Sequence, residues 1–316
     1  MAQDPQFSQF YANPLYLSPS LTGATDGSRA SVNFRDQWPE IPGAFVTYSA
    51  SFDQFLSRYK SGIGLMFLKD QAGSGKLGTT TVGLLYSYNI PITRTWMVRP
   101  GINFMYNTRS IDFSKLVFND QLAYNTSTST EIPTLEKIKY FDFSASAIVY
   151  SFRHWVGFTY DHLFMPNQSL LGVSNISNLP RKFSLYGGSK ILINGDLNKN
   201  SEESVSVTFL YKSQAKYDQL DLGLYWYKYS MMFGVWYRGI PMLKQYKKGY
   251  QNNDAAILMV GYKTETFSVG YSYDFTISRL ISSTGGAHEI SLVYVFNQNM
   301  KLQKRKKKVV VPCPRI

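Results

Sequence analysis

The sequence predicts an all-β fold: a transmembrane antiparallel β-barrel of about 14 strands in an outer membrane. Apolar and polar residues alternate with period two in segments spread over the 316 residues, as strands with one lipid-facing side require. No run of 18 apolar residues exists, which excludes a transmembrane helix, since about 20 are needed to cross the hydrocarbon core. Aromatic residues reach 16%, although the mean hydropathy is only −0.21. Aromatic girdles outside and polar side chains inside a barrel explain that mixture.

The alternation is clearest near the C-terminal end and recurs earlier. The apolar sets are Phe267, Val269, Tyr271, Tyr273 and Phe275; Ile290, Leu292, Tyr294 and Phe296; Val205, Val207, Phe209 and Tyr211; and Leu220, Leu222, Leu224 and Trp226. Small or polar residues fill most of the positions between them. One such strand would mean little, but several of about ten residues along the whole chain are typical of a barrel.

The alternation predicts fourteen strands. An even number of strands places the first and last residues of the barrel wall on the same side of the membrane. They are expected at residues 28–36, 43–54, 59–69, 78–89, 92–107, 138–151, 153–163, 180–193, 202–213, 216–228, 230–239, 254–264, 265–276 and 287–298.

The connections between these strands alternate in length. Tight turns are expected near 89–91, 151–153, 228–230 and 263–265, and long loops at 107–137, 163–179, 239–253 and 277–286. Outer-membrane barrels have short periplasmic turns and longer extracellular loops. We therefore expect both termini in the periplasm.

Three regions result. Residues 1–27 form an N-terminal segment in the periplasmic mouth or lumen, 28–298 form the barrel, and 299–316 form a basic periplasmic tail. No signal peptide is visible, so the protein is either cytoplasmic or a mature chain whose signal peptide has been removed. The small, polar start Ala2-Gln3-Asp4 favours the mature chain. Cys313 is the only cysteine, so no internal disulfide forms. Its thiol is either inert or pairs with a partner.

The formal charge of +12 raises the question of nucleic-acid binding. Much of it lies in the tail, which is either a solvated spacer or a contact for acidic periplasmic partners. The tail residues that would make this contact are Lys304, Arg305, Lys306, Lys307 and Lys308. Lys244, Lys247 and Lys248 form a second basic patch on an expected outer loop, where lipid phosphates would be attracted to it unless it is merely solvated. We expect no nucleic-acid partner.

No enzymatic, metal or cofactor site is expected. His154, His162 and His288 are too scattered for a zinc cluster. The neighbours Asp161 and His162 suggest a hydrolase dyad only weakly, since no nucleophile turn of the G-x-S-x-G kind accompanies them. The glycine-rich stretches at 73–75 and 285–286 are expected at the tips of loops. For Gly187 and Gly188, which lie inside a predicted strand, we expect a bulge or tight bend.

Several motifs closely resemble the PorP/SprF family of Bacteroidetes membrane proteins. They occur at 4–11, 13–19, 34–39, 270–274 and 285–292. The residues that carry them are Asp4, Pro5, Phe7, Ser8, Gln9, Tyr11, Asn13, Pro14, Trp38, Pro39, Tyr273, Asp274, Gly286, His288 and Glu289. The resemblance covers the whole barrel. Ala287 departs from the serine that commonly precedes the family's His-Glu pair.

The resemblance implies an outer-membrane component of type IX secretion and, in gliding bacteria, of gliding motility. It implies three kinds of partner: outer-membrane lipid, a secreted surface adhesin or other substrate, and periplasmic ring components of the machinery. The predicted function is therefore non-enzymatic docking or anchoring of a cell-surface protein. Some relatives carry a peptidoglycan-binding domain after the barrel; here a short basic tail follows it, so we expect no direct anchoring to the cell wall.

Two other functions compete with docking. A barrel of this size could be a channel or a hydrophobic-ligand transporter, although bulky inward residues (Leu85, Leu210 and Tyr225) and the N-terminal segment argue for a closed lumen. A soluble β-rich binding module would instead bury its apolar face against a second sheet.

Overall fold

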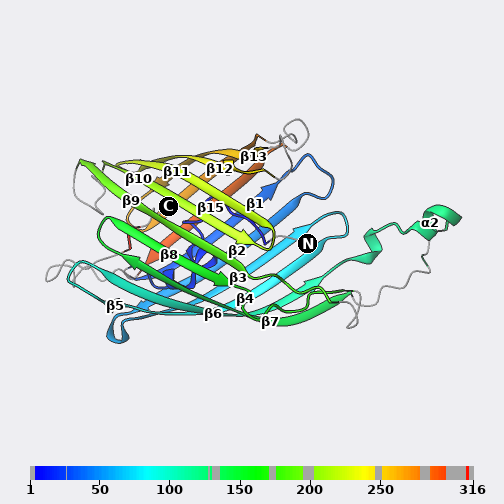
Figure 1. Cartoon of the computed structure of the whole chain (residues 1–316), viewed down its shortest axis with the longest axis horizontal. Coiled ribbons are helices and arrows are strands. Elements are labelled where there is room, and N and C mark those ends of the chain that lie inside the picture. Colours follow the sequence, from blue (N-terminus) through cyan, green and yellow to red (C-terminus); the bar gives the residue numbers. More distant parts are fainter. Residues whose placement is uncertain are drawn as a thin grey trace.

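The computed structural model describes residues 4–25, 27–126, 129, 136–170, 176–194, 203–245, 251–277, 285–296 and 311–312, of which residues 241–245 and 251–252 are described by backbone only. Fourteen antiparallel strands close into a barrel, and a two-residue strand, β5, pairs with its rim (Figure 1). The predicted all-β barrel is confirmed.

The strands match the sequence prediction closely. They are β1 (Ser28–Gln37), β2 (Phe45–Leu56), β3 (Ser61–Ala72), β4 (Leu77–Tyr88), β5 (Ile90–Pro91), β6 (Met97–Ser110), β7 (Lys137–Tyr150), β8 (His154–Asp161), β9 (Lys182–Asn194), β10 (Glu203–Gln214), β11 (Tyr217–Lys228), β12 (Met231–Gln245), β13 (Gln251–Lys263), β14 (Phe267–Thr276) and β15 (Ala287–Phe296). The short helices are α1 (Pro14–Leu17), η1 (Pro19–Leu21), η2 (Ser57–Tyr59), η3 (Phe113–Lys115) and α2 (Asn119–Tyr124).

The barrel closes between its first and last strands. β1 pairs with β15 from Ser28↔Phe296 to Gln37↔Ala287, and β4 pairs with β6 across the short β5. Closure leaves no free first or last strand in the wall, and a sheet that spans lipid needs such closure. Within the described residues, no helix has the length and apolarity to span a membrane, a finding that has no bearing on strands.

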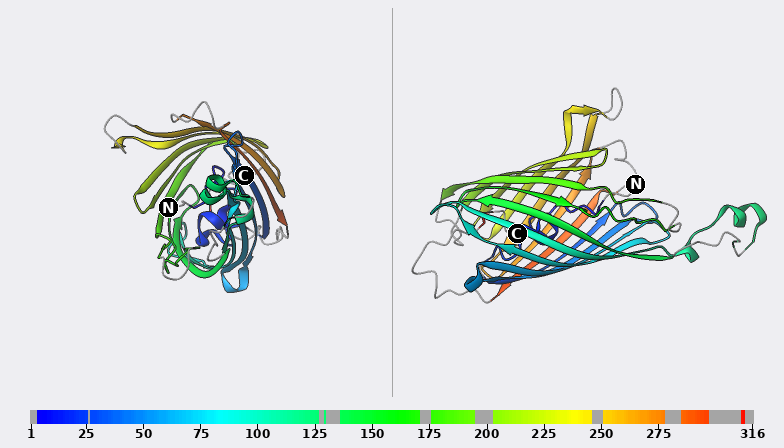
Figure 2. Two further views of the ribbon diagram at one scale, coloured as in Figure 1. Left: turned by 90° about the vertical axis from the view of Figure 1, so that its right-hand side faces the viewer. Right: turned by 60° about the horizontal axis from the view of Figure 1, so that its bottom comes forward.

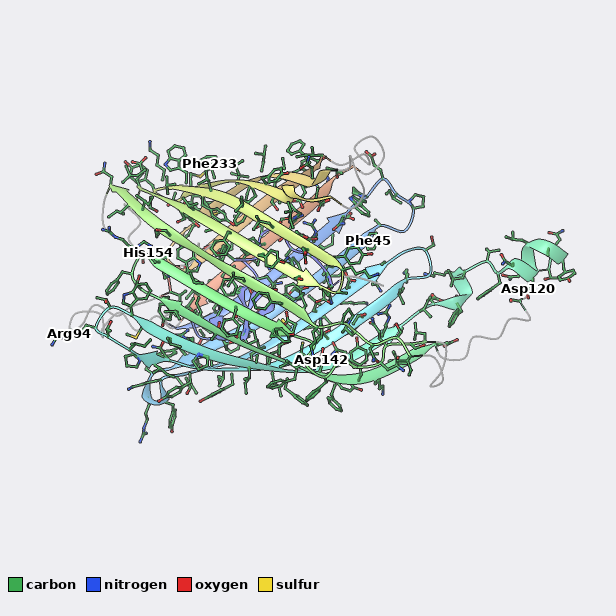
Figure 3. All side chains as sticks on the ribbon, viewed as in Figure 1. Phe45, Arg94, Asp120, Asp142, His154 and Phe233 are labelled. Carbon is green, nitrogen blue, oxygen red and sulfur yellow. The ribbon has the colours of Figure 1, made fainter. Side chains whose placement is uncertain are left out.

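The period-two pattern sorts side chains as predicted. In β11, Leu222, Leu224 and Trp226 are exposed outside the barrel, whereas Asp221 and Tyr225 are buried inside it. A soluble sandwich would have buried the apolar set, so that interpretation fails. The outward direction of such side chains is visible at Phe233 in Figure 3.

The two ends of the barrel differ. At one end, called the short-turn end, the chain reverses within a few residues, as at 151–153 and 264–266. At the other, called the long-loop end, the connection between β6 and β7 carries η3 and α2 far from the wall (Figure 1). In Figure 3, Arg94 and Asp120 mark these opposite ends.

Three local expectations were wrong. The strand expected at 92–107 begins at Met97, because 89–96 form a longer connection that contains β5. Much of the loop expected at 239–253 is a hairpin, in which β12 and β13 continue past register shifts after Arg238 and Ile240. No register shift occurs at Gly187 or Gly188. A Cβ on Gly188 would lie 2.5 Å from the Trp155 ring, so this glycine makes room for an inward indole.

The chain before β1 fills the lumen. It starts with Asp4 at the long-loop end, near His162 and Lys182, and reaches β1 at the short-turn end. The view along the barrel in Figure 2 shows this segment, with its short helices, inside the ring of strands. We call residues 4–25 the luminal segment.

Candidate functional site

Ser8 and Gln9 bind the barrel wall through the carboxylate of Glu289, some 280 positions later in the chain. The Ser8 amide donates to Oε2 at 2.7 Å and the Gln9 amide donates to Oε1 at 3.0 Å. The Gln9 side-chain amide donates to the carbonyl oxygen of Glu289 at 2.9 Å and accepts from the Ser291 hydroxyl at 2.6 Å. The two motifs that resemble the family at opposite ends of the sequence therefore meet in one contact.

Two buried arginines complete this contact. Arg35 lies 2.9 Å from Asp274 and 3.1 Å from Glu289, and Arg238 lies 2.9 Å from Asp274 and 3.3 Å from Asp221. Both guanidinium groups also donate to the Ser8 hydroxyl oxygen, each at 2.9 Å. Since buried charges are tolerated only when paired and hydrogen-bonded, Ser8 is fixed in an ionic network that costs much to open. We call these residues with Gln9 the central anchor.

An aromatic layer lies beside the central anchor. Phe10 meets the Trp236 ring edge-on at 4.9 Å, and Tyr11 lies 6.4 Å from Tyr225. The Trp155 indole donates to the Tyr11 hydroxyl oxygen at 3.2 Å. All five side chains are buried. These buried rings pack against one another and fill this part of the lumen with apolar side chains.

A second anchor holds the segment near the short-turn end. Arg29 binds Asp53 through two contacts of 2.8 and 2.9 Å, and the Gly23 amide donates to the same carboxylate at 2.6 Å. The Ser87 hydroxyl donates to the Thr22 carbonyl at 2.7 Å. A bidentate pair of this type stabilises the contact and also fixes the relative orientation of the two side chains.

Glycine lets the segment approach the wall at this level. A Cβ on Gly101 would lie 2.3 Å from the main-chain nitrogen of Ser20, and one on Gly62 would lie 2.2 Å from the Thr22 carbonyl oxygen. No real Cβ atom tolerates such contacts. The backbone of the segment and that of the wall are therefore in direct contact.

Asp4 forms a latch at the long-loop end. Its carboxylate lies 2.8 Å from His162 Nε2 and 2.6 Å from the Lys182 ammonium, while His162 Nδ1 lies 2.5 Å from Asp142. Burial favours the neutral imidazole, but the carboxylates of Asp4 and Asp142 outweigh it and raise the pKa of His162 to about 10. Burial also opposes ionisation of Asp4, yet His162 and Lys182 hold the pKa of Asp4 well below its usual value.

The other segment residues singled out from the sequence have structural contacts. The Pro5 carbonyl accepts from the Tyr16 hydroxyl, and Phe7 packs edge-on against the Tyr16 ring at 5.2 Å. Asn13 accepts from the Ser49 hydroxyl at 3.2 Å, and Pro14 begins α1.

The remaining motif residues meet outside the lumen, on the rim of β1, β14 and β15. The Trp38 amide donates to the Gly286 carbonyl at 2.8 Å, and the Tyr273 ring lies 4.8 Å from that of His288. Gly286 has a φ of +67°, and a Cβ there would lie 2.4 Å from the Asp274 carbonyl oxygen. Pro39 is exposed in the turn after Trp38. These residues fix the rim above the central anchor.

Two basic regions lie largely outside the described residues. Lys304–Lys308, Lys247, Lys248 and Cys313 are not described, and only the backbone of Lys244 is, within β12. Val311, by contrast, is 3% exposed and belongs to the same luminal cluster as Phe10, Tyr11 and Trp155. This part of the tail therefore returns to the barrel interior.

The hydrolase dyad considered from the sequence does not form. Asp161 lies 3.2 Å from Lys182, and His162 is held by Asp4 and Asp142 instead. Across the described ranges, no group of three or more His, Cys, Asp or Glu residues could hold a metal ion.

Most wall residues that bind the luminal segment were not predicted from the sequence. Arg29, Arg35, Asp53, Asp221 and Arg238 were not singled out, although each occupies an inward position of a strand. The available signal was a charged residue at an inward position of a strand. Water in an open lumen would solvate such a charge, whereas a filled lumen must provide a partner of opposite charge.

Comparison with known proteins agrees with the fold. The structure is similar to the toluene transporter TbuX of Ralstonia pickettii, with a TM-score of 0.50 and 11% identity over 89% of this chain and 93% of that one. It also matches the outer membrane protein Omp33 of Acinetobacter baumannii, with a TM-score of 0.45 and 8% identity over 86% and 99% of the two chains. No curated protein matches the chain by sequence.

The model of one protein family matches residues 1–294 and is described as the type IX secretion system membrane protein PorP/SprF. Together with the barrel fold, this match indicates an outer-membrane component of type IX secretion, and the family is non-enzymatic in kind. The chain belongs to the PorP/SprF family.

Proposed function

We propose that this protein is a sealed barrel that docks a secreted cell-surface protein, such as an adhesin, on its long-loop side and contacts the periplasmic secretion or motility machinery on its short-turn side. The observation that carries this proposal is the luminal segment. It occupies the lumen along its length and is held by the central anchor, the aromatic layer and the Arg29–Asp53 pair. A filled lumen leaves the outer surfaces as the functional part.

The orientation in this proposal puts the short-turn end in the periplasm, as is general for outer-membrane barrels. The chain then leaves β15 on the periplasmic side. Asp4 lies at the opposite, outer mouth because the luminal segment runs through the barrel. In this orientation, the part of the N-terminal segment next to β1 lies on the periplasmic side, as expected from the sequence, whereas Asp4 lies on the outer side.

The proposed division of labour follows the three regions expected from the sequence. Residues 1–27 seal the lumen, 28–298 hold the protein in lipid, and 299–316 reach the machinery through Lys304–Lys308. Burial of Val311 supports a tail that is tethered at its far end and not free. A tethered basic stretch presents its charges to an acidic partner at a lower entropic cost than a free one.

The connection between β6 and β7 is the most prominent outer feature. It projects from the barrel (Figure 1) and carries the apolar side chains of Val117, Leu122 and Tyr124, which are 69%, 73% and 78% exposed. Large exposed apolar groups on a protruding loop are typical of protein contact sites. We assign the secreted partner to this side.

The second candidate function is a channel or hydrophobic-ligand transporter. It is favoured by the barrel fold shared with a toluene transporter. Transport through this barrel would require the luminal segment to leave its paired charges, and removing one partner of a buried ion pair costs about 3–5 kcal/mol. We therefore place docking first.

The docking proposal is tested by a detergent pull-down of the tagged full-length protein from its native envelope, with mass spectrometry of the recovered proteins. A large extracellular protein or components of the periplasmic ring should accompany the barrel. Recovery of the barrel alone, while other envelope complexes remain intact in the same extract, would favour the transporter.

A further inference from the structure

One side of β7 lacks a neighbouring strand over its outer half. β7 pairs with β6 along its whole length, from Met97↔Tyr150 to Ser110↔Lys137. On its other side, β8 pairs only with Ala145–Tyr150. Within the described residues, no strand lies beside Lys137–Ser144 on that side.

The ladder between β7 and β8 ends at an ionic cap. The Leu163 amide donates to the Phe143 carbonyl at 3.1 Å, and the Phe143 amide donates to the Asp142 carboxylate at 2.8 Å. The other Asp142 oxygen lies 2.5 Å from His162. The loop after β8 is thus fixed at this level and does not continue the ladder.

The main-chain groups beyond this cap face the open side. The N–H and C=O of one residue point to the same side of a strand, and alternate residues share a side. Since the Phe143 carbonyl points towards β8, the main-chain groups of Lys139 and Phe141 point to the open side as well. In the described part of the chain these groups have no hydrogen-bond partner there.

This edge stands at the outer boundary of the apolar band. β7 has 14 residues, and a tilted strand needs only about ten to cross a band of about 25 Å. Counted from Tyr150 at the short-turn end, ten residues reach Phe141, whose ring lies 5.5 Å from Phe104 and 5.3 Å from Tyr106. Such ring clusters mark a membrane interface, and Lys137–Lys139 lie outside it.

We propose that this edge of β7 binds an extended, acidic segment of the secreted partner, which adds a strand to the sheet at Lys139 and Phe141. Lys137, Lys139 and Phe141 are exposed and project from one face. Cross-strand pairing then calls for carboxylates opposite the two lysines and an apolar residue opposite Phe141. The same lysines repel the edge of a second copy of this barrel. This inference rests on the docking function and specifies its binding mode.

The test compares Lys139→Pro with Lys139→Ala in the full-length protein, purified from its native envelope. Proline removes a main-chain donor that the barrel does not use, and edge strands tolerate it. Alanine keeps that donor and removes only the charge. Quantitative mass spectrometry of the co-purified extracellular protein should show at least a tenfold loss for Lys139→Pro and less than a threefold loss for Lys139→Ala.

Equal recovery with Lys139→Pro and with the unsubstituted protein would overturn the strand-addition proposal and leave the docking function standing. No extracellular protein with the unsubstituted chain would instead overturn the docking function. If Lys139→Pro does not show the heat-dependent gel mobility of a folded barrel, the test uses a photo-crosslinking amino acid at position 139 instead of proline. A crosslink to the extracellular protein from position 139, and none from the same amino acid at position 94 at the opposite end, would support strand addition at this edge. Equal crosslinking at both positions, or none at either, would contradict it.

Discussion

The luminal segment and the loop between β6 and β7 are of similar length, yet their side chains lie in opposite surroundings. In the luminal segment even polar side chains such as Ser8, Gln9 and Asn13 are buried. In the loop, apolar side chains such as Leu122 and Tyr124 are exposed. Ser8 and Gln9 inside the barrel are hydrogen-bonded to the wall, whereas the apolar groups outside have no such cover among the described residues.

This difference indicates where binding energy is still available. The luminal segment is bound to the wall through Asp4, Ser8 and Gln9, so it contributes rigidity and closure. Among the described residues, the loop has exposed apolar surface and the β7 edge has unpaired main-chain groups. Burying the apolar surface on a partner is favourable at about 25 cal/mol per Å². Sealing and docking are thus separated in the molecule.

The largest expected effect comes from deleting residues 4–22. The wall pairs through its own ladders and should still form, but the lumen loses the central anchor and its aromatic layer. Vesicles that contain the deletion variant should swell in small sugars, whereas vesicles with the intact protein should not. Equal swelling rates would show that the segment does not seal the barrel.

Deleting 113–126 tests the other region. These residues make no strand of the wall, so the denaturation midpoint should stay within experimental error. Recovery of the extracellular partner in the pull-down should fall about tenfold. A large loss of stability with unchanged recovery would reverse the roles assigned to the two regions.

Arg35→Met should destabilise the barrel by about 3–5 kcal/mol, because Asp274 and Glu289 lose a buried counter-charge. Adding Glu289→Gln should recover part of that loss, since one uncompensated charge is removed. Denaturant unfolding in detergent measures both. Strictly additive losses would indicate that the central anchor is not a coupled network.

Gly101→Ala should cost about 1–3 kcal/mol and displace the segment, because its Cβ would overlap the Ser20 main chain at 2.3 Å. Gly83→Ala is the matched control on the neighbouring strand. The three atoms nearest to its Cβ would all belong to the Asn103 side chain, which can move. A common effect of both substitutions on segment mobility would contradict the close backbone contact.

The smallest effect concerns pH and the latch at Asp4. His162 has a raised pKa of about 10, so its contribution is complete below the unfolded value near 6.5, declines above it and is lost above about pH 10. Asp4 has a lowered pKa, and its contribution is present above about pH 4 and lost as the pH falls through the lowered value.

A nitroxide at Gln6→Cys, in a Cys313→Ser background, should therefore become mobile as the pH rises towards 10 and stay immobile near pH 6. His162→Gln should remove this transition. A transition of the same size in His162→Gln would assign the effect to another group.

The sequence was sufficient for the wall and insufficient for the lumen. Period two is a local signal, so the strands, and the inward positions of Leu85, Leu210 and Tyr225, could be placed without tertiary information. The contact of Ser8 and Gln9 with Glu289 joins two ends of the chain, and it depends on the closure of β1 against β15 and on the path of the luminal segment. Neither the closure nor the path of the segment produces a periodic pattern in the sequence. Likewise, nothing near Gly188 indicates that the distant indole of Trp155 needs its space.

The most direct test of the sealed-barrel account is the conductance of the intact, full-length protein in a planar lipid bilayer. The account predicts a silent barrel, because the luminal segment is fixed by Ser8, Gln9 and the Arg29–Asp53 pair at two levels of the lumen. Steady, reproducible current steps from the folded, unmodified protein would contradict it and would make the transporter the leading function.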